Sequence, residues 1–552
     1  MGDLTLKKLN NFSGRVGPLV LIIMDGVGLG EKNDKNAFYL AKTPFLDKIQ
    51  SDWPKKKLCT RLKAHGTAVG LPDDNEMGNS EVGHNAIGAG NVVKQRAVLA
   101  KEAIESKTLF QTKKWQNLTQ PIIKNNKTLH LIGLLSDGYV HSHISHLFGL
   151  LHGSEASGVK KLRIHVLLDG RDVPPKSALK YVDELENQLG EINKIKGFDY
   201  QIASGGGRMR VTMDRYYSDW GVVQRGWEAH VCGIPEILPN YKGYFTSARE
   251  AVKCARSTDS NLNDQYLPSF VIVDNDNQPI GVMENGDGVL FFNFRGDRAI
   301  EISRAFDEKN LFNEFMKRCD PQVKYYGLLE YDEKEHIPEN YLIDPPQMED
   351  CLSQYLCNEK VKQFAIAETH KYGHVTYFYN GNKEGYIDED FEKYVEIKSD
   401  PSETIQTHPK MKAFEVKDEL IKAIKSDKYR YLRVNFANGD MVGHTGDINA
   451  AIIAAETVDT CVKEVVDTVN SKNGITLITA DHGNLEEMEG RFETAHTLNP
   501  VMFAIIDSSY NNEYVIDDTI SNPDLGNIAA TLVNLLGYEK PNGFKDSLIK
   551  FL

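Results

Sequence analysis

The stretch Leu19-Val-Leu-Ile-Ile-Met-Asp25-Gly26 places an uninterrupted apolar run directly before an acidic residue and a glycine. A short run of this kind, rich in Leu, Val and Ile and without polar alternation, is typical of a strand buried on both faces in a parallel sheet. Asp25 then stands at the carboxyl end of the strand. This is the edge of the sheet at which α/β proteins bind their ligands.

The same pattern recurs along the chain. Further apolar runs end in polar or glycine-rich clusters: His130–Leu135 before Ser136, Ile164–Leu168 before Asp169, Gln201–Ala203 before Ser204–Arg208, Val289–Phe294 before Arg295, Tyr431–Phe436 before Asn438, and Ile475–Thr479 before Asp481. Helical patterns lie between the runs, as in the apolar steps of three or four from Ile448 to Val469. Alternating strands and helices predict an α/β fold. The breakers at 88–91 and 344–346 suggest that one domain is inserted into another.

Composition limits the class of protein. The 552 residues include 64 Lys and Arg against 78 Asp and Glu, a net charge of −14, with 41% hydrophobic and 26% charged residues. This is an ordinary soluble composition, and its acidic balance argues against a nucleic-acid or membrane partner. At roughly 150 residues per domain, the length corresponds to three or four domain equivalents.

The sequence also predicts a cytoplasmic location. No apolar signal segment precedes Leu19, and the run that ends at Met24 is too short to cross a bilayer. The seven cysteines are odd in number, scattered and without CxxC spacing. We therefore expect reduced thiols rather than a disulfide framework or a zinc knuckle.

A candidate nucleophile lies in the segment 77–88, Met-Gly-Asn-Ser-Glu-Val-Gly-His-Asn-Ala-Ile-Gly. Ser80 follows a Gly-Asn breaker and precedes an expected helix, so its hydroxyl would lie where the helix dipole favours an anion. The alternative is that Ser80 is only a helix N-cap. A hydrolase nucleophile elbow is disfavoured because Val82 stands where glycine is needed. A metal would have to activate this serine.

Candidate metal ligands surround such a serine at several expected strand ends. They are Asp25, Asp440, His444, Asp481, His482 and His496. Carboxylate, imidazole and hydroxyl ligands suit Mn²⁺, Mg²⁺, Co²⁺ or Zn²⁺. The neighbours Asp481 and His482 would point apart in an extended segment, which favours two ions. Two divalent cations would also balance the charge of Asp25, Asp440, Asp481 and an ionised Ser80.

A second constellation in the middle of the chain is rich in arginine. It comprises Arg171 with Asp172, Arg208, Arg215, Arg295 and Arg298, with His141 as a candidate acid, base or orienting group. Guanidinium groups match carboxylate and phosphate oxygens, so these residues predict a pocket for a small polyanion, with structural salt bridges as the alternative. The glycine-rich Gly26-Val-Gly-Leu-Gly30 lacks the third glycine of a dinucleotide fingerprint, since Glu31 stands there, and there is no Walker A loop.

Taken together and in this order, the motifs resemble those of the cofactor-independent phosphoglycerate mutases of the alkaline phosphatase superfamily. The resemblance covers nearly the whole chain and includes Phe294-Arg-Gly-Asp-Arg298, Glu368-Thr-His-Lys-Tyr372 and Asp481-His-Gly-Asn484. It implies two α/β domains. An alkaline-phosphatase-like domain of residues 1–92 and 345–552 would carry an inserted transferase domain of residues 93–344, with a hinge at the two crossovers.

The resemblance implies a metal-dependent isomerase that interconverts 3-phosphoglycerate and 2-phosphoglycerate through a phosphoserine on Ser80, without 2,3-bisphosphoglycerate. One ion would be held by Asp25, Ser80, Asp481 and His482, and the other by Asp440, His444 and His496, with Mn²⁺ expected and Mg²⁺, Co²⁺ or Zn²⁺ as alternatives. Asp172 would carry the proton and Lys371 would assist phosphoryl transfer. The substrate pocket would comprise His141, Arg171, Asp172, Arg208, Arg215, Arg295, Arg298 and Lys371. The resemblance favours a monomer.

Some alternatives remain open at this point. The segment between Arg208 and Arg215 contains Arg210, so either Arg208 or Arg210 could face the substrate. A metal phosphatase or a phosphosugar mutase of the same superfamily is the second hypothesis. A regulator on an inactive enzyme scaffold is the third, although it would require a broken ligand set and none is visible.

Overall fold

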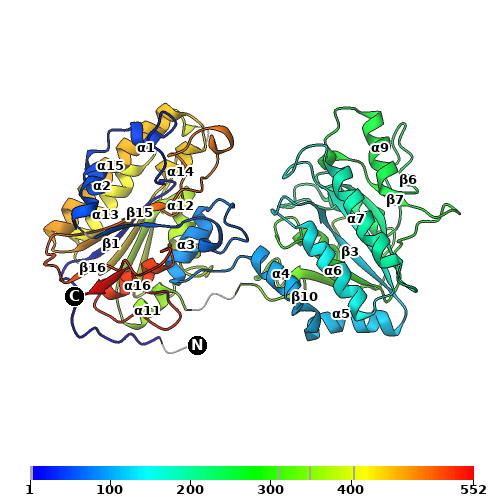
Figure 1. The fold of residues 1–552 in the computed structure, drawn as a ribbon, viewed down its shortest axis with the longest axis horizontal. Helices are drawn as coiled ribbons and strands as arrows, with labels where there is room; N and C mark the ends of the chain where they lie inside the picture. Colours follow the sequence, from blue (N-terminus) through cyan, green and yellow to red (C-terminus); the bar gives the residue numbers. More distant parts are fainter. Residues whose placement is uncertain (1–3, 57, 309–310, 347–349, 402–403) are drawn as a thin grey trace. The chain divides into compact units, whose positions relative to one another are not determined.

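The computed structural model describes residues 4–56, 58–308, 311–346, 350–401 and 404–552. The chain divides into two compact units, each with its own sheet and core (Figure 1). Unit 1 comprises Met1–Gln95 and Gln347–Leu552, and unit 2 comprises Arg96–Pro346. The roles expected for two such domains, phosphatase-like and transferase, stay predictions.

Unit 1 is built on a mainly parallel sheet. Its seven strands lie in the order β12 (Glu392–Ile397), β11 (Gln363–Glu368), β13 (Tyr431–Phe436), β1 (Leu19–Met24), β14 (Ile475–Thr479), β15 (Val501–Asp507) and β2 (Cys59–Leu62). Only β15 pairs antiparallel with its neighbours. The opening apolar run is the central strand β1, and all its side chains are buried. A small second sheet pairs β16 (Tyr514–Ile516) with β17 (Ile549–Phe551).

Helices cover both faces of this sheet (Figure 1). On one face lie α1 (Ala37–Leu40), α2 (Pro44–Lys56), α13 (Ala413–Lys425) and α15 (Ile448–Ser471). On the other lie α3 (Ser80–Ala89), α11 (Leu352–Asn358) and α16 (Asn527–Leu535). The short helices α12 (Thr369–Gly373) and α14 (Asn438–Gly443) directly follow β11 and β13. Strand ends and helix starts therefore meet at one edge of the sheet.

Unit 2 contains a longer, mixed sheet. Its order is β10 (Tyr341–Ile343), β9 (Lys324–Leu329), β8 (Gly288–Phe291), β3 (Thr128–Leu135), β4 (Lys161–Leu168), β5 (Asp199–Gly207), β7 (Phe270–Ile272) and β6 (Tyr244–Phe245). The strands from β10 to β5 run parallel, and β7 pairs antiparallel with β5. Both faces of the sheet are buried, as expected for parallel strands.

Two separate cores flank the unit 2 sheet. One is packed by α4 (Arg96–Glu105), α5 (Lys113–Lys124), α6 (Ile144–Ser157), α7 (Ala178–Asn193) and α9 (Ala248–Thr258). The other is packed by α8 (Trp220–His230) and α10 (Ile300–Asp307), around Trp227 and Phe306. The predicted α/β fold is confirmed. The expected end of the strand after Ala203 is wrong, because β5 continues through the glycines to Gly207.

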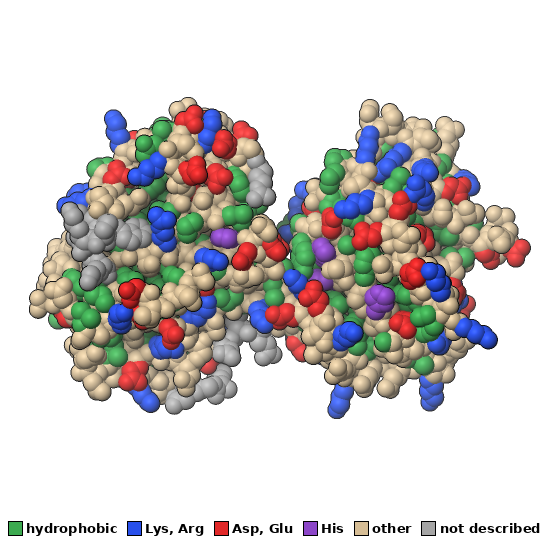
Figure 2. Space-filling model, viewed as in Figure 1, with side chains coloured by type: hydrophobic (Ala, Val, Ile, Leu, Met, Phe, Trp, Pro, Cys, Tyr) green, Lys and Arg blue, Asp and Glu red, His purple; other side chains and the backbone are tan. Residues whose placement is uncertain are grey.

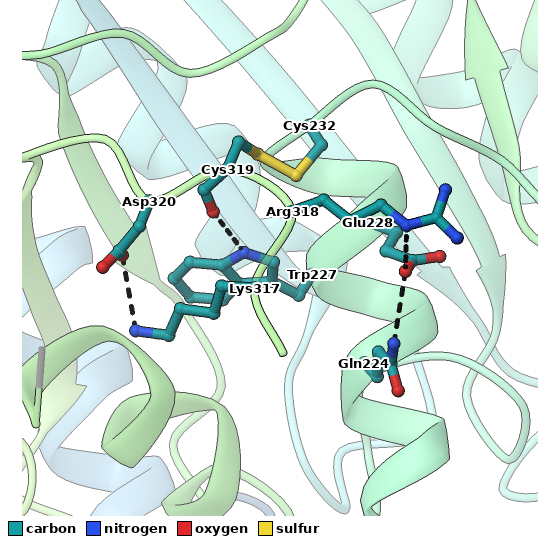
Figure 3. Close-up of a disulfide and its surroundings, with 8 residues drawn as sticks. All are labelled: Gln224, Trp227, Glu228, Cys232, Lys317, Arg318, Cys319 and Asp320. Atoms are coloured by element: carbon teal, nitrogen blue, oxygen red, sulfur yellow. Dashed lines mark hydrogen bonds and ion pairs between the residues drawn. A yellow bond between two sulfur atoms is a disulfide. The ribbon is translucent and has the colours of Figure 1, made fainter. Parts of the chain in front are cut away.

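The expectation that every cysteine is reduced is also wrong. Cys232, just after α8, and Cys319, before β9, form a disulfide across 87 residues of sequence, with Cα atoms 5.8 Å apart (Figure 3). Sequence spacing does not reveal this pairing because folding creates the proximity. Beside the disulfide, the Trp227 indole donates a 2.9 Å hydrogen bond to the Cys319 carbonyl, and the Lys317 ammonium lies 4.6 Å from the Trp227 ring centroid. The other five cysteines form no disulfide: Cys59, Cys254, Cys351, Cys357 and Cys461.

The surface is mixed in charge. On the face drawn in Figure 2, basic and acidic side chains are interspersed over both units, and the described residues show no broad basic area there. None of the helices formed by the described residues combines the length and apolar character needed to cross a bilayer.

Candidate active site

Three acidic residues meet at the carboxyl ends of adjacent strands in unit 1. Asp25 follows β1, Asp440 lies in α14 after β13, and Asp481 follows β14. All three are buried, with exposed fractions of 0–3%. Because parallel strands end at the same edge, β1, β13 and β14 deliver these side chains to one place.

Ser80 is the first residue of α3 and faces this acidic cluster. Its Oγ lies 3.2 Å from Asp25 Oδ1 and 3.0 Å from His482 Nε2. Asn79 is the N-cap, and its side chain accepts a hydrogen bond from the Val82 amide. The alternative that Ser80 caps the helix is therefore wrong. The Ser80 hydroxyl therefore does not cap the helix, and it lies at the positive end of the helix dipole.

Lys371, in α12, reaches the same point. Its Nζ donates hydrogen bonds to Ser80 Oγ at 2.6 Å, Asp25 Oδ1 at 2.8 Å and Asp440 Oδ2 at 2.6 Å. Burial opposes the charge of the Lys371 ammonium, but the carboxylates of Asp25, Asp440 and Asp481 outweigh burial and raise its pKa above the ordinary value. Lys371 is thus a fixed cation beside the serine hydroxyl.

The histidines complete two sets of ligand atoms. Asp25, Asp481 and His482 form one set and Asp440, His482 and His496 the other, and the ligand atoms within each set lie within 4.8 Å of one another. His444 Nε2 is 3.1 Å from Asp440 Oδ1 and 3.1 Å from His496 Nε2. His482 lies between the two sets. The expectation that Asp481 and His482 point apart is wrong, because Asp481 Oδ2 and His482 Nε2 are only 3.8 Å apart.

The electrostatics of these histidines reflect the surrounding carboxylates. Burial of His482 is outweighed by Asp481, Asp25 and Asp440, which together raise its pKa to about 10. The hydrogen bond to Asp440 raises the pKa of His444, whereas burial lowers that of His496. The carboxylates therefore favour the protonated forms of His482 and His444. Metal binding would displace those protons.

The donor set fits divalent cations. Oxygen and imidazole ligands are those of Mn²⁺, Mg²⁺, Co²⁺ and Zn²⁺ sites. Asp481 Oδ2 is buried and accepts no hydrogen bond from the described residues. It has ion-pair contacts with His84 Nδ1 at 3.3 Å and His482 Nε2 at 3.8 Å, and a divalent cation would balance its charge in their place.

Two supporting residues were not predicted from the sequence. Asn435, in β13, donates a 2.6 Å hydrogen bond to Asp25 Oδ2. His84 lies one helical turn after Ser80, with Nδ1 2.8 Å from the Ser80 carbonyl oxygen and 3.3 Å from Asp481 Oδ2. A polar Asn within the apolar run of β13 is the signal that could have identified Asn435.

The glycine-rich loop after β1 has a different role from phosphate binding. A Cβ on Gly28 would lie 2.4 Å from Glu486 Oε1, and a Cβ on Gly30 would lie 2.6 Å from the Glu486 carbonyl oxygen. The lack of a Cβ at Gly28 and Gly30 therefore leaves room for Glu486, which is 2% exposed, to pack against the loop.

Glu486 connects three ligand loops. Its carboxylate accepts hydrogen bonds from the Gly28 amide at 2.9 Å, the Asn484 amide at 2.9 Å and the Thr497 hydroxyl. These partners belong to the loops that carry Asp25, Asp481 with His482, and His496. One buried carboxylate thus fixes the relative positions of three loops.

In unit 2, the loop after β4 forms an acidic pair held by Arg208. Arg208 Nη1 donates to Asp169 Oδ1 at 3.0 Å and also to Asp172. Asp169 in turn accepts from the Ser136 hydroxyl at 2.6 Å and from the amides of Arg171 and Asp172 at 3.1 Å. Asp172 is thereby held at the carboxyl ends of β4 and β5.

Four arginines surround His141. Burial, together with the nearby charges of Arg208, Arg295, Arg298 and Arg215, lowers the pKa of His141 to about 2. His141 is therefore neutral at pH 7. Asp297 lies 3.6 Å from His141 Nδ1, 3.1 Å from Arg295 Nε and 3.6 Å from Arg215 Nη1. His141 Nδ1, Arg208 Nε and both Asp297 oxygens are buried without hydrogen-bond partners among the described residues, which is typical of a site that accepts a polar ligand.

Arg208 and Arg210 differ in environment. Arg208 is 1% exposed and lies in the arginine cluster. Arg210 instead makes a paired salt bridge with Glu236, from Nε and Nη2 at 2.9–3.1 Å. The geometry favours Arg208 as the residue available to the site. Of the predicted pocket residues, Lys371 belongs to unit 1 and the others to unit 2.

Comparisons with known proteins agree with these features. Residues 17–540 match the model of the metalloenzyme superfamily. A probable 2,3-bisphosphoglycerate-independent phosphoglycerate mutase of Leptospira interrogans is 45% identical over 99% of this chain and 100% of its own. The 2,3-bisphosphoglycerate-independent phosphoglycerate mutase of Trypanosoma brucei brucei is 45% identical over 96% of this chain and 97% of its own. A crystal structure of Leishmania mexicana phosphoglycerate mutase at low cobalt concentration is similar with a TM-score of 0.71, at 42% identity over 99% of this chain and 100% of that one.

Proposed function

The chain belongs to the 2,3-bisphosphoglycerate-independent phosphoglycerate mutases of the metalloenzyme superfamily and is an isomerase of 3-phosphoglycerate and 2-phosphoglycerate, and we propose that it works through a phosphoserine on Ser80. The observation that carries the proposal is the position of Ser80 Oγ, 2.6 Å from the Lys371 ammonium and beside two sets of metal-ligand atoms. A hydroxyl so placed is an activated nucleophile.

The enzyme depends on divalent metal, and we propose two ions, with Mn²⁺ as the physiological metal. Asp25, Ser80, Asp481 and His482 would hold one and Asp440, His444 and His496 the other. Such ions, when bound, lower the pKa of the serine hydroxyl and stabilise the charge that develops on the phosphoryl oxygens. Asp481 Oδ2, which accepts no hydrogen bond from the described residues, supports this assignment.

The residues of the chain have distinct roles in the transfer. Ser80 Oγ forms a bond to phosphorus as the bond from phosphorus to the glycerate oxygen breaks. Lys371 donates a hydrogen bond to the reacting oxygen and offsets developing negative charge. The serine loses its proton and glycerate gains one, so the step is balanced.

The four arginines around His141, together with Arg171, would hold the glycerate. Arg171, Arg208, Arg215, Arg295 and Arg298 supply cations for its carboxylate, and neutral His141 can donate or accept a hydrogen bond. Asp172, held by Arg208, would give a proton to the departing glycerate oxygen and take one from the other glycerate hydroxyl as that hydroxyl attacks the phosphoserine.

The test is a coupled assay of 3-phosphoglycerate conversion without 2,3-bisphosphoglycerate, with each of Mn²⁺, Mg²⁺, Co²⁺ and Zn²⁺ supplied in turn. We expect activity that exhaustive chelation abolishes, and a phosphorylated Ser80 peptide in rapidly quenched enzyme. Full activity in Ser80→Ala would reject the phosphoserine. Release of inorganic phosphate in place of 2-phosphoglycerate, or a preference for a phosphopentose, would instead support a phosphatase or a phosphosugar mutase.

We further propose a cytoplasmic monomer. The buried thiols of Cys351, Cys357 and Cys461 are compatible with a reducing compartment, in which the Cys232–Cys319 disulfide would have to resist reduction. Cell fractionation and light scattering at micromolar concentration test these two statements.

A further inference from the structure

A line of buried polar side chains crosses the core of unit 2, and the proposed reaction leaves it without a role. It runs from the loop before β8, through β3, β4 and β5 and the end of α8, to the turn after β5. Its members are Asp287, His130, His165, Ser204, His230 and Thr212, each at most 2% exposed. We refer to these six residues as the histidine chain.

Each member contacts the next through its polar atoms. Asp287 Oδ2 lies 3.3 Å from His130 Nε2, and His130 Nδ1 lies 3.0 Å from His165 Nε2. The Ser204 hydroxyl is 2.7 Å from both His165 Nδ1 and His230 Nδ1. His230 Nε2 is 3.0 Å from the Thr212 hydroxyl. Every ring nitrogen of the three histidines is therefore engaged.

The direction of the hydrogen bonds follows from the charge states. Burial lowers the pKa of His130, His165 and His230, the last to about 3, so each ring is neutral and carries one N–H. Burial of Asp287 is outweighed by its hydrogen bonds, beginning with that from His130, so its pKa is lowered and it is an ionised acceptor.

With an acceptor fixed at one end, each group must donate towards Asp287. His130 Nε2 donates to Asp287, and His165 Nε2 donates to His130 Nδ1. The Ser204 hydroxyl donates to His165 Nδ1, and His230 Nδ1 donates to the Ser204 hydroxyl. The Thr212 hydroxyl is then the terminal donor, to His230 Nε2.

Thr212 has an unusual backbone. Its φ is +70°, in the left-handed region that β-branched residues rarely adopt. Besides the hydroxyl contact, its amide donates a 2.8 Å hydrogen bond to the Val222 carbonyl in α8. A Cβ on Gly226 would lie 2.0 Å from Thr212 Oγ1, so α8 approaches this side chain only because residue 226 is glycine.

The strained turn lies within the arginine cluster. Arg208 precedes it and Arg215 follows it, and both lie near His141. The Met213 carbonyl, one residue beyond Thr212, accepts a 2.6 Å hydrogen bond from Arg298 Nη1. Thr212 therefore lies in the segment that carries Arg208 and Arg215, next to the carbonyl that binds Arg298.

We propose that Thr212 is a positioning residue for the anionic substrate, held by the histidine chain in a conformation that orders Arg208, Arg215 and Arg298 around His141. The proposal rests on the proposed function, in which these arginines bind the substrate. It assigns to the buried histidines a role in substrate affinity rather than in proton transfer to substrate.

The first experiment compares three substitutions in the full-length metal-loaded enzyme. Thr212→Val keeps the shape but loses the hydroxyl, and we expect KM for 3-phosphoglycerate to rise about tenfold with kcat changed by less than about threefold. Thr212→Ser, which restores the donor, should recover most of the affinity. Thr212→Gly adopts positive φ without strain and should have a lower KM than Thr212→Val despite lacking the hydroxyl.

Thr119→Val is the matched control. Thr119 is 2% exposed in α5, and its hydroxyl donates to the Trp115 carbonyl on the other core of unit 2. The same chemical change there should lower the melting temperature without raising KM. An equal KM for Thr212→Val and wild type, or a KM for Thr212→Gly as high as that of Thr212→Val, would overturn the proposal.

A double-mutant cycle separates this inference from the proposed function. Arg298→Met alone should raise KM, and combined with Thr212→Val it should raise KM by less than the product of the two single effects. If Arg298→Met leaves KM unchanged, the assignment of the arginines to substrate fails. If Arg298→Met raises KM but the two effects multiply independently, only the role of Thr212 fails.

The direction of the hydrogen bonds in the histidine chain can be measured independently of activity. Long-range ¹⁵N spectra of histidine-labelled protein should show His230 protonated at Nδ1 and His130 and His165 protonated at Nε2. In Thr212→Val, the Nε2 resonance of His230 should shift towards that of a free acceptor. The opposite tautomer at His230 in the wild-type protein would overturn the assignment of Thr212 as donor.

Discussion

At the scale of single residues, the site depends on the balance between the buried Lys371 ammonium and the carboxylates around it. Lys371 is buried, 4% exposed, and its ammonium contacts two carboxylates and the serine hydroxyl. In the proposed mechanism Lys371 acts through its charge, and it also binds carboxylate oxygens that the proposed metal ions need.

Lys371→Gln should separate these two effects. We expect kcat to fall by roughly 10²–10³ because a cation aimed at the reacting oxygen is lost. The affinity for Mn²⁺, measured by titration calorimetry, should stay the same or increase because a competing cation is removed. A parallel loss of Mn²⁺ affinity and activity would indicate that Lys371 only maintains the fold.

Glu301, in α10, should make the stability of the protein depend on pH near neutrality. Burial raises its pKa to about 7, and nearby Asp214 adds to the effect. The pKa of Glu301 in the folded protein thus exceeds its value in the unfolded chain. The protonated carboxyl therefore contributes its full stabilisation of the fold below about pH 4.3, and this contribution is lost as the pH rises through 7.

Glu301→Gln removes this ionisation while Oε1 can still accept the hydrogen bond from the Tyr217 amide. The melting temperature of the variant minus that of wild type should therefore become more positive as the pH rises from 5 to 8. Thermal melts at four pH values test this. A constant difference across the range would exclude Glu301 as the titrating group.

At the scale of elements, the loops that carry the ligands are fixed by contacts that sequence patterns do not reveal. The apolar run Leu19–Met24 forms strand β1 as predicted, because a short run with apolar side chains on both faces is typical of a strand buried on both sides. Asp25, Asp481 and His482 lie after apolar strands as predicted, and Ser80 begins a helix as predicted. The position of Glu486 could not be predicted, since its three partners come from loops far apart in the sequence.

Glu486→Gln should loosen these loops. An amide can accept fewer hydrogen bonds than a carboxylate, and we expect Mn²⁺ affinity to fall by about 10–100-fold. Glu489→Gln, a substitution of an exposed glutamate three residues away, is the control and should bind Mn²⁺ normally. Equal affinities in the two variants would show that Glu486 does not position the ligand loops.

The disulfide should stabilise unit 2 by tying the end of α8 to the segment before β9. Loss of the bond in Cys232→Ser with Cys319→Ser should cost about 2–4 kcal/mol in the free energy of unfolding. Denaturant titration followed by tryptophan fluorescence measures this cost. Alkylation of unfolded, unreduced protein should label five thiols, and labelling of all seven would show that the bond is absent.

At the scale of the whole molecule, the proposed metal ligands all belong to unit 1. The sequence predicted the α/β class and an insertion from breakers near the two crossings. It could not predict the mixed order of the strands in unit 2, because antiparallel pairing of β7 with β5 depends on contacts between short runs with weak patterns.

Metal should therefore stabilise the units unequally. Calorimetric scans of the full chain should show one transition that rises with Mn²⁺ concentration and one that does not, since a ligand stabilises only the structure that binds it. Chelation should reverse the shift. A uniform shift of the whole transition would mean that the two units unfold together.

The central position of β1 has a consequence for protein synthesis. Both neighbours of β1 come from the second piece of unit 1, since Leu19 pairs with Tyr431 and with Ile475. At roughly 5–20 residues per second, a ribosome needs about 20–80 seconds to translate the intervening chain. Throughout that time the apolar strand has no partner, while unit 2 can already fold on the growing chain. The nascent protein is therefore exposed to aggregation at a segment that is fully buried in the folded protein, and chaperone binding to residues 19–24 during translation would protect it.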